Sequence, residues 1–195
     1  MAHQRPRWAG AIVGMACLFG AKADAQSNAR PVLHLQLFSP GAEVHAVRNA
    51  IEGAWRRLSD ADCQKILFDF TDGSGKPLAA NLTMGRTARE WLADLRFVEA
   101  RHYGQCKTHD SVAFTQTGLR VVYLCGSFFA NPLFSLRGTP GEMIVIHELL
   151  HTLGLPENPP SSEEITRQVT RRCGNSKRKG RGLSPALSLP IRYSP

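Results

Sequence analysis

Three residues within residues 143–158 have the types and the spacing of a metal-dependent hydrolytic site. His147 and His151 are four residues apart, so on a helix both imidazoles project from one face and can reach one ion. Glu148 follows His147 directly, so its carboxylate lies beside such an ion and can take a proton from a metal-bound water. This H-E-x-x-H pattern predicts a zinc site with Glu148 as the general base.

The residues around this pattern predict the helix that it needs. Thr139, Pro140 and Glu142 read as a capping box, with Thr139 as the N-cap, Pro140 at the first helical position and Glu142 as the third residue. Apolar residues cover most of the helix, and Gly154 stands where a left-handed C-cap is expected. Two histidines and a glutamate are costly in such a buried helix unless they are paired or bind a metal ion. The alternative is a core helix with hydrogen-bonded histidines and no metal.

The rest of the chain predicts a single small α+β domain. Strands are expected at residues 32–38, 65–70, 112–117 and 119–125, the last two joined tightly near Gly118. Helices are expected from Ser39 through an apolar stripe that ends at Leu58, and at residues 86–98. Residues 126–138 read as a loop. A second capping box, Ser161 with Glu164, opens a final helix whose apolar positions are Ile165, Val169 and Cys173. We therefore expect a small mixed sheet with an active-site helix and flanking helices.

The N-terminal residues resemble a secretory signal peptide. Arg5 and Arg7 precede a short apolar run at residues 8–20, and Ala23 with Ala25 forms an A-x-A cleavage site. The run is too short to span a bilayer. We divide the chain into a signal peptide (1–25), a folded domain (26–173) and a basic tail (174–195), and we expect a secreted or periplasmic protein without stable membrane insertion. A lipoprotein through Cys17 and an uncleaved membrane anchor are the alternatives.

Four cysteines remain after residues 1–25 are removed. An even number in an exported chain predicts two disulfides, with three possible connectivities. We expect the pairs Cys63–Cys106 and Cys125–Cys173.

The formal charge of +8 is concentrated at the two ends of the chain. Residues 1–25 carry a net charge of +2 and the tail after Cys173 carries +5, so residues 26–173 are close to neutral at +1. The tail is rich in Gly, Ser and Pro without periodicity, and we predict that it is disordered. A nucleic-acid-binding function would rest on this tail alone. We instead expect a monomer that acts on a peptide or protein substrate and binds no nucleic acid.

Residues 121–154 resemble secreted zincin metallopeptidases. The order YLCGSFF, a loop and IVIHELLHTLGL is similar to the deuterolysin-like group, and the HExxHxxG stretch at residues 147–154 is similar to the metzincin motif. The likeness covers roughly a fifth of the chain. It implies a zincin-like domain with Zn2+ as the cofactor, His147 and His151 as zinc ligands and Glu148 as the general base. It also implies an edge strand above the active-site helix, and we take residues 119–125 as the candidate.

The chain departs from these families in its third ligand. Metzincins place a histidine or an aspartate three residues after the glycine, where this chain has Glu157. A carboxylate oxygen is a legitimate zinc ligand, so we predict Glu157 as the third ligand, with Glu163 and Glu164 as rivals. Glu164 is discounted because the capping box already uses it. No methionine follows His151, so the Met-turn is absent, and the G-T-x-x-D element of the deuterolysin-like group is missing.

The sequence therefore predicts an exported zinc metallopeptidase, a hydrolase that cleaves peptide bonds with a zinc-bound water activated by Glu148. The alternative is a non-catalytic, exported zincin-like binding domain of the cell envelope. The missing family elements favour that alternative, whereas the intact Glu148 argues against it. Three tyrosines are candidates for stabilising an oxyanion: Tyr103, Tyr123 and Tyr193. Four histidines are expected at the surface or in strands: His34, His45, His102 and His109.

Overall fold

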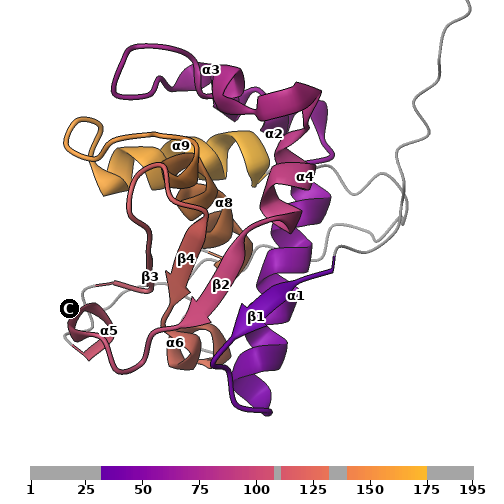
Figure 1. Ribbon diagram of the computed structural model, residues 1–195, viewed down its shortest axis with the longest axis vertical. Coiled ribbons are helices and arrows are strands. Elements are labelled where there is room, and N and C mark those ends of the chain that lie inside the picture. The colour runs from indigo at the N-terminus through magenta and orange to yellow at the C-terminus, as the bar shows by residue number, and fades with distance from the viewer. Residues whose placement is uncertain (1–31, 108–110, 132–139, 175–195) are drawn as a thin grey trace, which may run out of the picture.

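The computed structural model describes residues 32–107, 111–131 and 140–174. Its centre is a four-stranded sheet in the order β1-β2-β4-β3, formed by β1 (His34–Gln36), β2 (Arg96–Glu99), β3 (Ala113–Phe114) and β4 (Val121–Leu124). Strands β1, β2 and β4 are parallel, and β3 runs antiparallel to β4 (Figure 1). The predicted signal peptide, Thr139, His109 and the tail from residue 175 lie outside the described residues.

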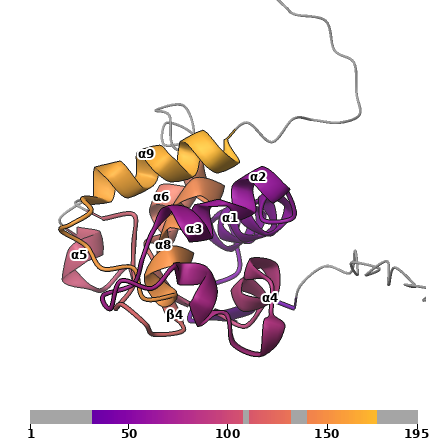
Figure 2. The ribbon, with the colours of Figure 1, turned by 90° about the horizontal axis from the view of Figure 1, so that it is seen from above.

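Three long helices lie together on one side of this sheet. They are α1 (Ala42–Arg57), α8 (Gly141–Thr152) and α9 (Ser162–Cys173). Helix α8 packs against α1 and against β3 and β4, and α9 lies on the side of α8 away from β4 (Figure 2). Shorter helical turns complete the described chain: α2 (Ala61–Gln64), α3 (Ile66–Asp69), η1 (Leu78–Asn81), η2 (Thr83–Gly85), α4 (Ala88–Ala93), α5 (Gly104–Lys107) and α6 (Gly126–Ala130).

The position of α8 explains why its sequence is apolar on nearly every side. Its residues Ile146, Leu149 and Leu150 are fully buried, and they share one hydrophobic core with Ile51 of α1 and Val122 of β4. A helix enclosed by a sheet, a second helix and a third helix has no face left for charged side chains. The predicted buried helix is therefore present, and the α+β class is confirmed.

Two other helices also follow the sequence prediction. Helix α1 buries the predicted apolar stripe, including Val47 and Ile51. Helix α9 begins at a complete capping box, in which the Ser161 hydroxyl accepts a hydrogen bond from Glu164 N and the Glu164 carboxylate accepts one from Ser161 N. The antiparallel pair β3–β4 confirms the predicted hairpin, with shorter strands than expected.

Three element predictions are wrong. Residues 65–70 form no strand, because Asp60 caps a helical turn and the chain continues through α2 and α3. The predicted helix at 86–98 ends at Ala93, and Arg96–Glu99 is the strand β2. Phe97, Val98 and Glu99 are all buried, so β2 shows no alternation and its apolar residues extend the helical pattern of α4. The predicted loop at 126–138 begins with the short helix α6.

The start of α8 and the edge of the sheet also differ from the prediction. Pro140 is the N-cap of α8 and not its first helical residue. The Glu142 carboxylate accepts hydrogen bonds from Arg57 of α1, so it links the two helices, and its predicted capping partner Thr139 lies outside the described residues. Strand β4 lies between β2 and β3, so residues 119–125 are not the edge strand, and β3 occupies that edge.

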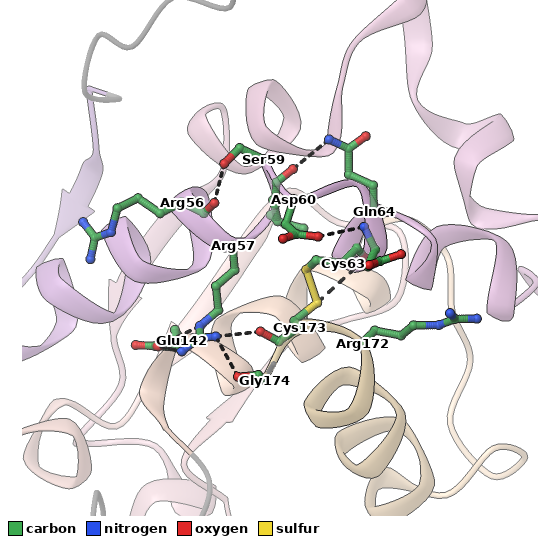
Figure 3. Close-up of a disulfide and its surroundings, with 12 residues drawn as sticks. Arg56, Arg57, Ser59, Asp60, Cys63, Gln64, Glu142, Arg172, Cys173 and Gly174 are labelled. Atoms are coloured by element: carbon green, nitrogen blue, oxygen red, sulfur yellow. Dashed lines mark hydrogen bonds and ion pairs between the residues drawn. A yellow bond between two sulfur atoms is a disulfide. The ribbon is translucent and has the colours of Figure 1, made fainter. Parts of the chain in front are cut away.

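The two disulfides join Cys63 to Cys173 and Cys106 to Cys125, so the predicted connectivity is wrong. Cys63 lies on α2 and Cys173 at the end of α9, two helices that pack together (Figure 3). Such contacts between distant segments have no signature in the local sequence. Two disulfides fit an oxidising, exported environment. Within the described ranges, no helix is long and apolar enough to cross a membrane.

Candidate metal centre

The two histidines of the motif meet at the C-terminal end of α8. Both side chains are buried, each residue being 5% exposed. Their rings are tilted, with centroids 5.0 Å apart, and their Nε2 atoms lie 3.1 Å from each other. The one-turn spacing of a helix therefore brings the two ring nitrogens to a common point.

The other ring nitrogen of each histidine, Nδ1, contacts a polar group of the protein. His151 Nδ1 lies 2.8 Å from the carbonyl oxygen of Leu155, and His147 Nδ1 lies 2.9 Å from the hydroxyl oxygen of Thr166 on α9. A carbonyl only accepts hydrogen bonds, so Nδ1 of His151 carries a proton and a neutral His151 presents a lone pair at Nε2. This arrangement is typical of metal-binding histidines, whose second nitrogen donates to a carbonyl, carboxylate or other acceptor.

The partner of His151 is placed by the turn that ends α8. Gly154 adopts a φ of +98°, a backbone conformation that favours glycine, and it confirms the predicted C-cap. Its N–H donates to the carbonyl of His151 (2.9 Å), and the N–H of Leu155 donates to the carbonyl of Leu150 (3.1 Å). These two bonds form a Schellman motif, which turns the chain back so that the Leu155 carbonyl faces the imidazole.

Glu157 follows this turn and completes a three-residue group. The candidate ligand atoms of His147, His151 and Glu157 all lie within 4.8 Å of one another, and these three residues can hold a metal ion. Glu157 is exposed on the connection between α8 and α9. The rival Glu164 is engaged in the capping box, and Glu163 does not belong to the group among the described residues.

The distances suit a small tetrahedral ion. Bonds of about 2.0 to 2.1 Å to a tetrahedral zinc ion place neighbouring ligand atoms about 3.3 Å apart. The Nε2 atoms of His147 and His151 are 3.1 Å apart, close to that value. Burial and the neighbouring His151 lower the pKa of His147 to about 3, so its imidazole is neutral at physiological pH, as a metal ligand must be.

Glu148 is buried beside this group without a complete set of partners. The residue is 5% exposed, and its Oε2 atom makes no hydrogen bond to any described residue. Burial raises its pKa to about 7; the nearby Thr115 hydroxyl opposes this rise, and the charge of Glu157 adds to it. Thr115 Oγ1 is itself buried and has no hydrogen-bond partner among the described residues. A carboxylate in this state is a candidate for chemistry, because structural carboxylates are normally paired.

The other predicted site residues lie apart from this group. Tyr103 and Tyr123 form an aromatic cluster with Phe114, with ring centroids 5.3 Å apart for the two tyrosines and 5.0 Å for Phe114 and Tyr123. No hydrogen bond in the described part of the chain joins either tyrosine to the motif, and Tyr193 lies outside that part. Three histidines are exposed at the surface, as predicted: His34, His45 and His102.

Sequence reasoning missed two hydroxyl residues at the site. Thr166 follows Ile165 in the predicted last helix, and Thr115 lies directly after β3. Neither has a recognisable motif, since each reaches α8 only through packing of distant segments. The helical periodicity of Ile165, Val169 and Cys173 identified the buried face of α9 but not the element that it covers.

Comparison with known proteins leaves the site to be interpreted from its own residues. The chain matches no protein-family model, no curated protein and no solved structure. The resemblance to zincins therefore stays a prediction from the motif. What the geometry provides is two inward-facing imidazole nitrogens, one exposed carboxylate that can join them and one buried carboxylate alongside.

Proposed function

We propose that the protein is an exported zinc-dependent peptidase, with His147, His151 and Glu157 as zinc ligands and Glu148 as the general base. The observation that carries this proposal is the pair of Nε2 atoms 3.1 Å apart, each ring being held from behind at Nδ1. If the helix only buried its histidines, the buried carboxylate of Glu148 would not be needed next to them.

Zinc is the ion that this donor set fits best. Two histidines and one carboxylate are a common catalytic zinc ligand set, and three protein ligands leave a fourth position for water or substrate. Zinc bound there would lower the pKa of a coordinated water to near neutrality and polarise a carbonyl. The two disulfides support function in an oxidising compartment, where a secreted peptidase would meet peptide or protein substrates.

The role of Glu148 follows from its environment. A general base works best when its pKa lies near the working pH, and burial raises the pKa of Glu148 to about 7. Its free Oε2 atom is able to accept a proton from the attacking water and later to deliver that proton to the leaving amine. The nearby Thr115 hydroxyl lowers the pKa of Glu148 and so partly opposes the effect of burial.

The test is zinc content and peptide cleavage in matched variants of the exported protein. Wild type should contain about one zinc per chain and cleave members of a peptide library. Glu148→Gln should keep the zinc and lose turnover, whereas Glu157→Ala should lose zinc. Glu163→Ala changes a nearby exposed glutamate and should behave as wild type.

Two results would contradict this proposal. Zinc-dependent cleavage by Glu148→Gln would remove the proposed general base. A wild type that takes up no zinc after reconstitution would leave the non-catalytic binding domain as the better description. If Glu157→Ala retains zinc, another residue is the third ligand, and the proposed activity still stands.

A further inference from the structure

Helix α9 supplies the group that contacts His147, and this contact differs chemically from the one at His151. The partner of His151 is the Leu155 carbonyl, which only accepts a hydrogen bond. The partner of His147 is the Thr166 hydroxyl, which can either donate or accept. The first contact fixes the tautomer of His151, whereas the second leaves two tautomers open to His147.

The short distance between the two rings makes this difference matter. With Nε2 of His151 as an acceptor, His147 is satisfied in the absence of an ion if its own Nε2 carries the proton and donates across the 3.1 Å gap. Nδ1 of His147 is then an acceptor, and the Thr166 hydroxyl donates to it. An ion bound between the rings requires the opposite state, in which Nδ1 of His147 is protonated and donates to Thr166 Oγ1.

We propose that Thr166 is a positioning residue whose hydroxyl lets His147 change tautomer when a metal ion binds; this inference rests on the proposed metal centre. A carbonyl in the place of Thr166 would fix the proton on Nδ1. Two Nε2 lone pairs would then face each other at close range in the metal-free protein. An apolar residue there would leave the buried Nδ1–H of the metal-bound state without a partner, which is costly.

Packing and cross-links of α9 hold the Thr166 hydroxyl in place. Ile165 and Val169, which flank Thr166 along the buried face, are fully buried. At the far end of the helix, the Cys63–Cys173 disulfide and the ion pair of Arg172 with Asp69 (Nε to Oδ2, 2.6 Å) fix α9 to the α2–α3 segment. Thr166 is therefore held relative to α8 by contacts on both sides, and its hydroxyl is preorganised for His147.

The first measurement is zinc affinity, obtained by competition with a chromogenic chelator. Thr166→Val keeps the shape of the side chain and removes the hydroxyl, and it should weaken zinc binding about 10-fold to 100-fold, the usual effect of losing a group that orients a ligand. Thr166→Ser retains the hydroxyl and should bind zinc nearly as wild type does. Thr170→Val makes the same substitution at an exposed position of the same helix and should be neutral.

The second measurement identifies the proton directly by 15N NMR of the histidine side chains. In wild type, the proton of His147 should lie on Nε2 in the metal-free protein and on Nδ1 in the zinc-bound protein. This readout needs no variant, so it can overturn the inference even if Thr166→Val does not fold. Zinc on Nε2 itself requires the proton on Nδ1, so the state that reports on Thr166 is the metal-free protein, where a hydroxyl that donates to Nδ1 keeps the proton of His147 on Nε2.

Several outcomes would overturn the inference. These are a wild-type His147 that carries its proton on Nδ1 in both states, an unchanged zinc affinity in Thr166→Val, or an equal loss of affinity in Thr166→Val and Thr166→Ser, which would indicate packing of the methyl group. Each of these leaves the proposed zinc site standing. A wild type that binds no zinc would overturn this inference and the proposed function together.

Discussion

Removing the Cys63–Cys173 disulfide should weaken the metal centre, although neither cysteine is near it in sequence. The disulfide fixes the C-terminal end of α9, and α9 carries Thr166, which contacts His147. The other disulfide, Cys106–Cys125, joins α5 to the end of β4, and neither of its cysteines lies on α9 or on the α2–α3 segment that holds α9. It therefore serves as a matched control.

The expected size of the stability effect follows from the loops that the disulfides close. Cys63 and Cys173 are 110 residues apart, and Cys106 and Cys125 are 19 apart. A cross-link over about 100 residues stabilises by about 4.7 kcal/mol through the entropy of the unfolded chain, and one over about 15 residues by about 3 kcal/mol. Replacing each pair with alanines avoids burying new hydroxyls, so the losses should approach about 5 and about 3 kcal/mol, respectively.

Helix α9 should nevertheless stay in place without its disulfide. Arg57 donates to the Cys173 carbonyl at 2.6 Å, and Arg172 pairs with Asp69 (Figure 3 draws the Arg57 contacts). The domain should therefore fold with α9 held less firmly. Saturating zinc would then stabilise the variant less than the wild type, and a tenfold loss of zinc affinity makes this difference about 1.4 kcal/mol.

The assay is urea denaturation of both double variants, with saturating zinc and with a chelator. Both variants should be less stable than wild type, but only Cys63→Ala/Cys173→Ala should gain less stability from zinc. An equal zinc-dependent gain in the two variants would refute the coupling between α9 and the metal centre. A smaller zinc-dependent gain in stability in Cys106→Ala/Cys125→Ala alone would also contradict this coupling.

Three further predictions concern single residues. Hydrogen bonding to Arg172 lowers the pKa of Asp69, so its stabilisation is present above about pH 4 and is lost on acidification; Asp69→Asn should flatten the acid branch of a urea-stability profile. In chelator-treated protein, the pKa of Glu148 is about 7 in the folded state and 4.5 in the unfolded chain. The free energy of unfolding should therefore fall by about 3 kcal/mol as pH rises between these two values, and Glu148→Gln should abolish this fall. Gly154→Ala should cost at least about 1 kcal/mol and lower zinc content, because the positive φ is strained for alanine and the turn places the Leu155 carbonyl.

The features that could be predicted from the sequence are those encoded within a few residues. The i, i+4 histidines, the C-cap at Gly154 and the Ser161–Glu164 capping box each depend on neighbours in the same turn or helix. Each of these local elements is present in the structure. The α+β class followed because periodicity of either kind is also a local signal.

The predictions that failed depend on contacts between distant segments. The cysteine partners are set by the packing of α2 on α9 and of α5 near β4, which four cysteines in a sequence do not encode. Strand β2 was predicted as helix because it is buried and lacks alternation, so its residue Phe97 continues the apolar spacing of Trp91 and Leu92. Its strand character arises from parallel pairing with β1 and β4.

The same distinction between local and long-range contacts applies to the candidate site. The three candidate ligands come from residues 147–157, one continuous segment, so the spacing alone nominates them. The groups that act on the protonation of His147 and of the proposed base Glu148 come from elsewhere: Thr166 from α9 contacts His147, and Thr115 from beyond β3 lies near Glu148. Which residues can bind an ion is therefore a local property of this chain, whereas where their protons lie depends on the tertiary structure. Substitution of Thr166 in α9 should consequently change metal affinity without altering any ligand.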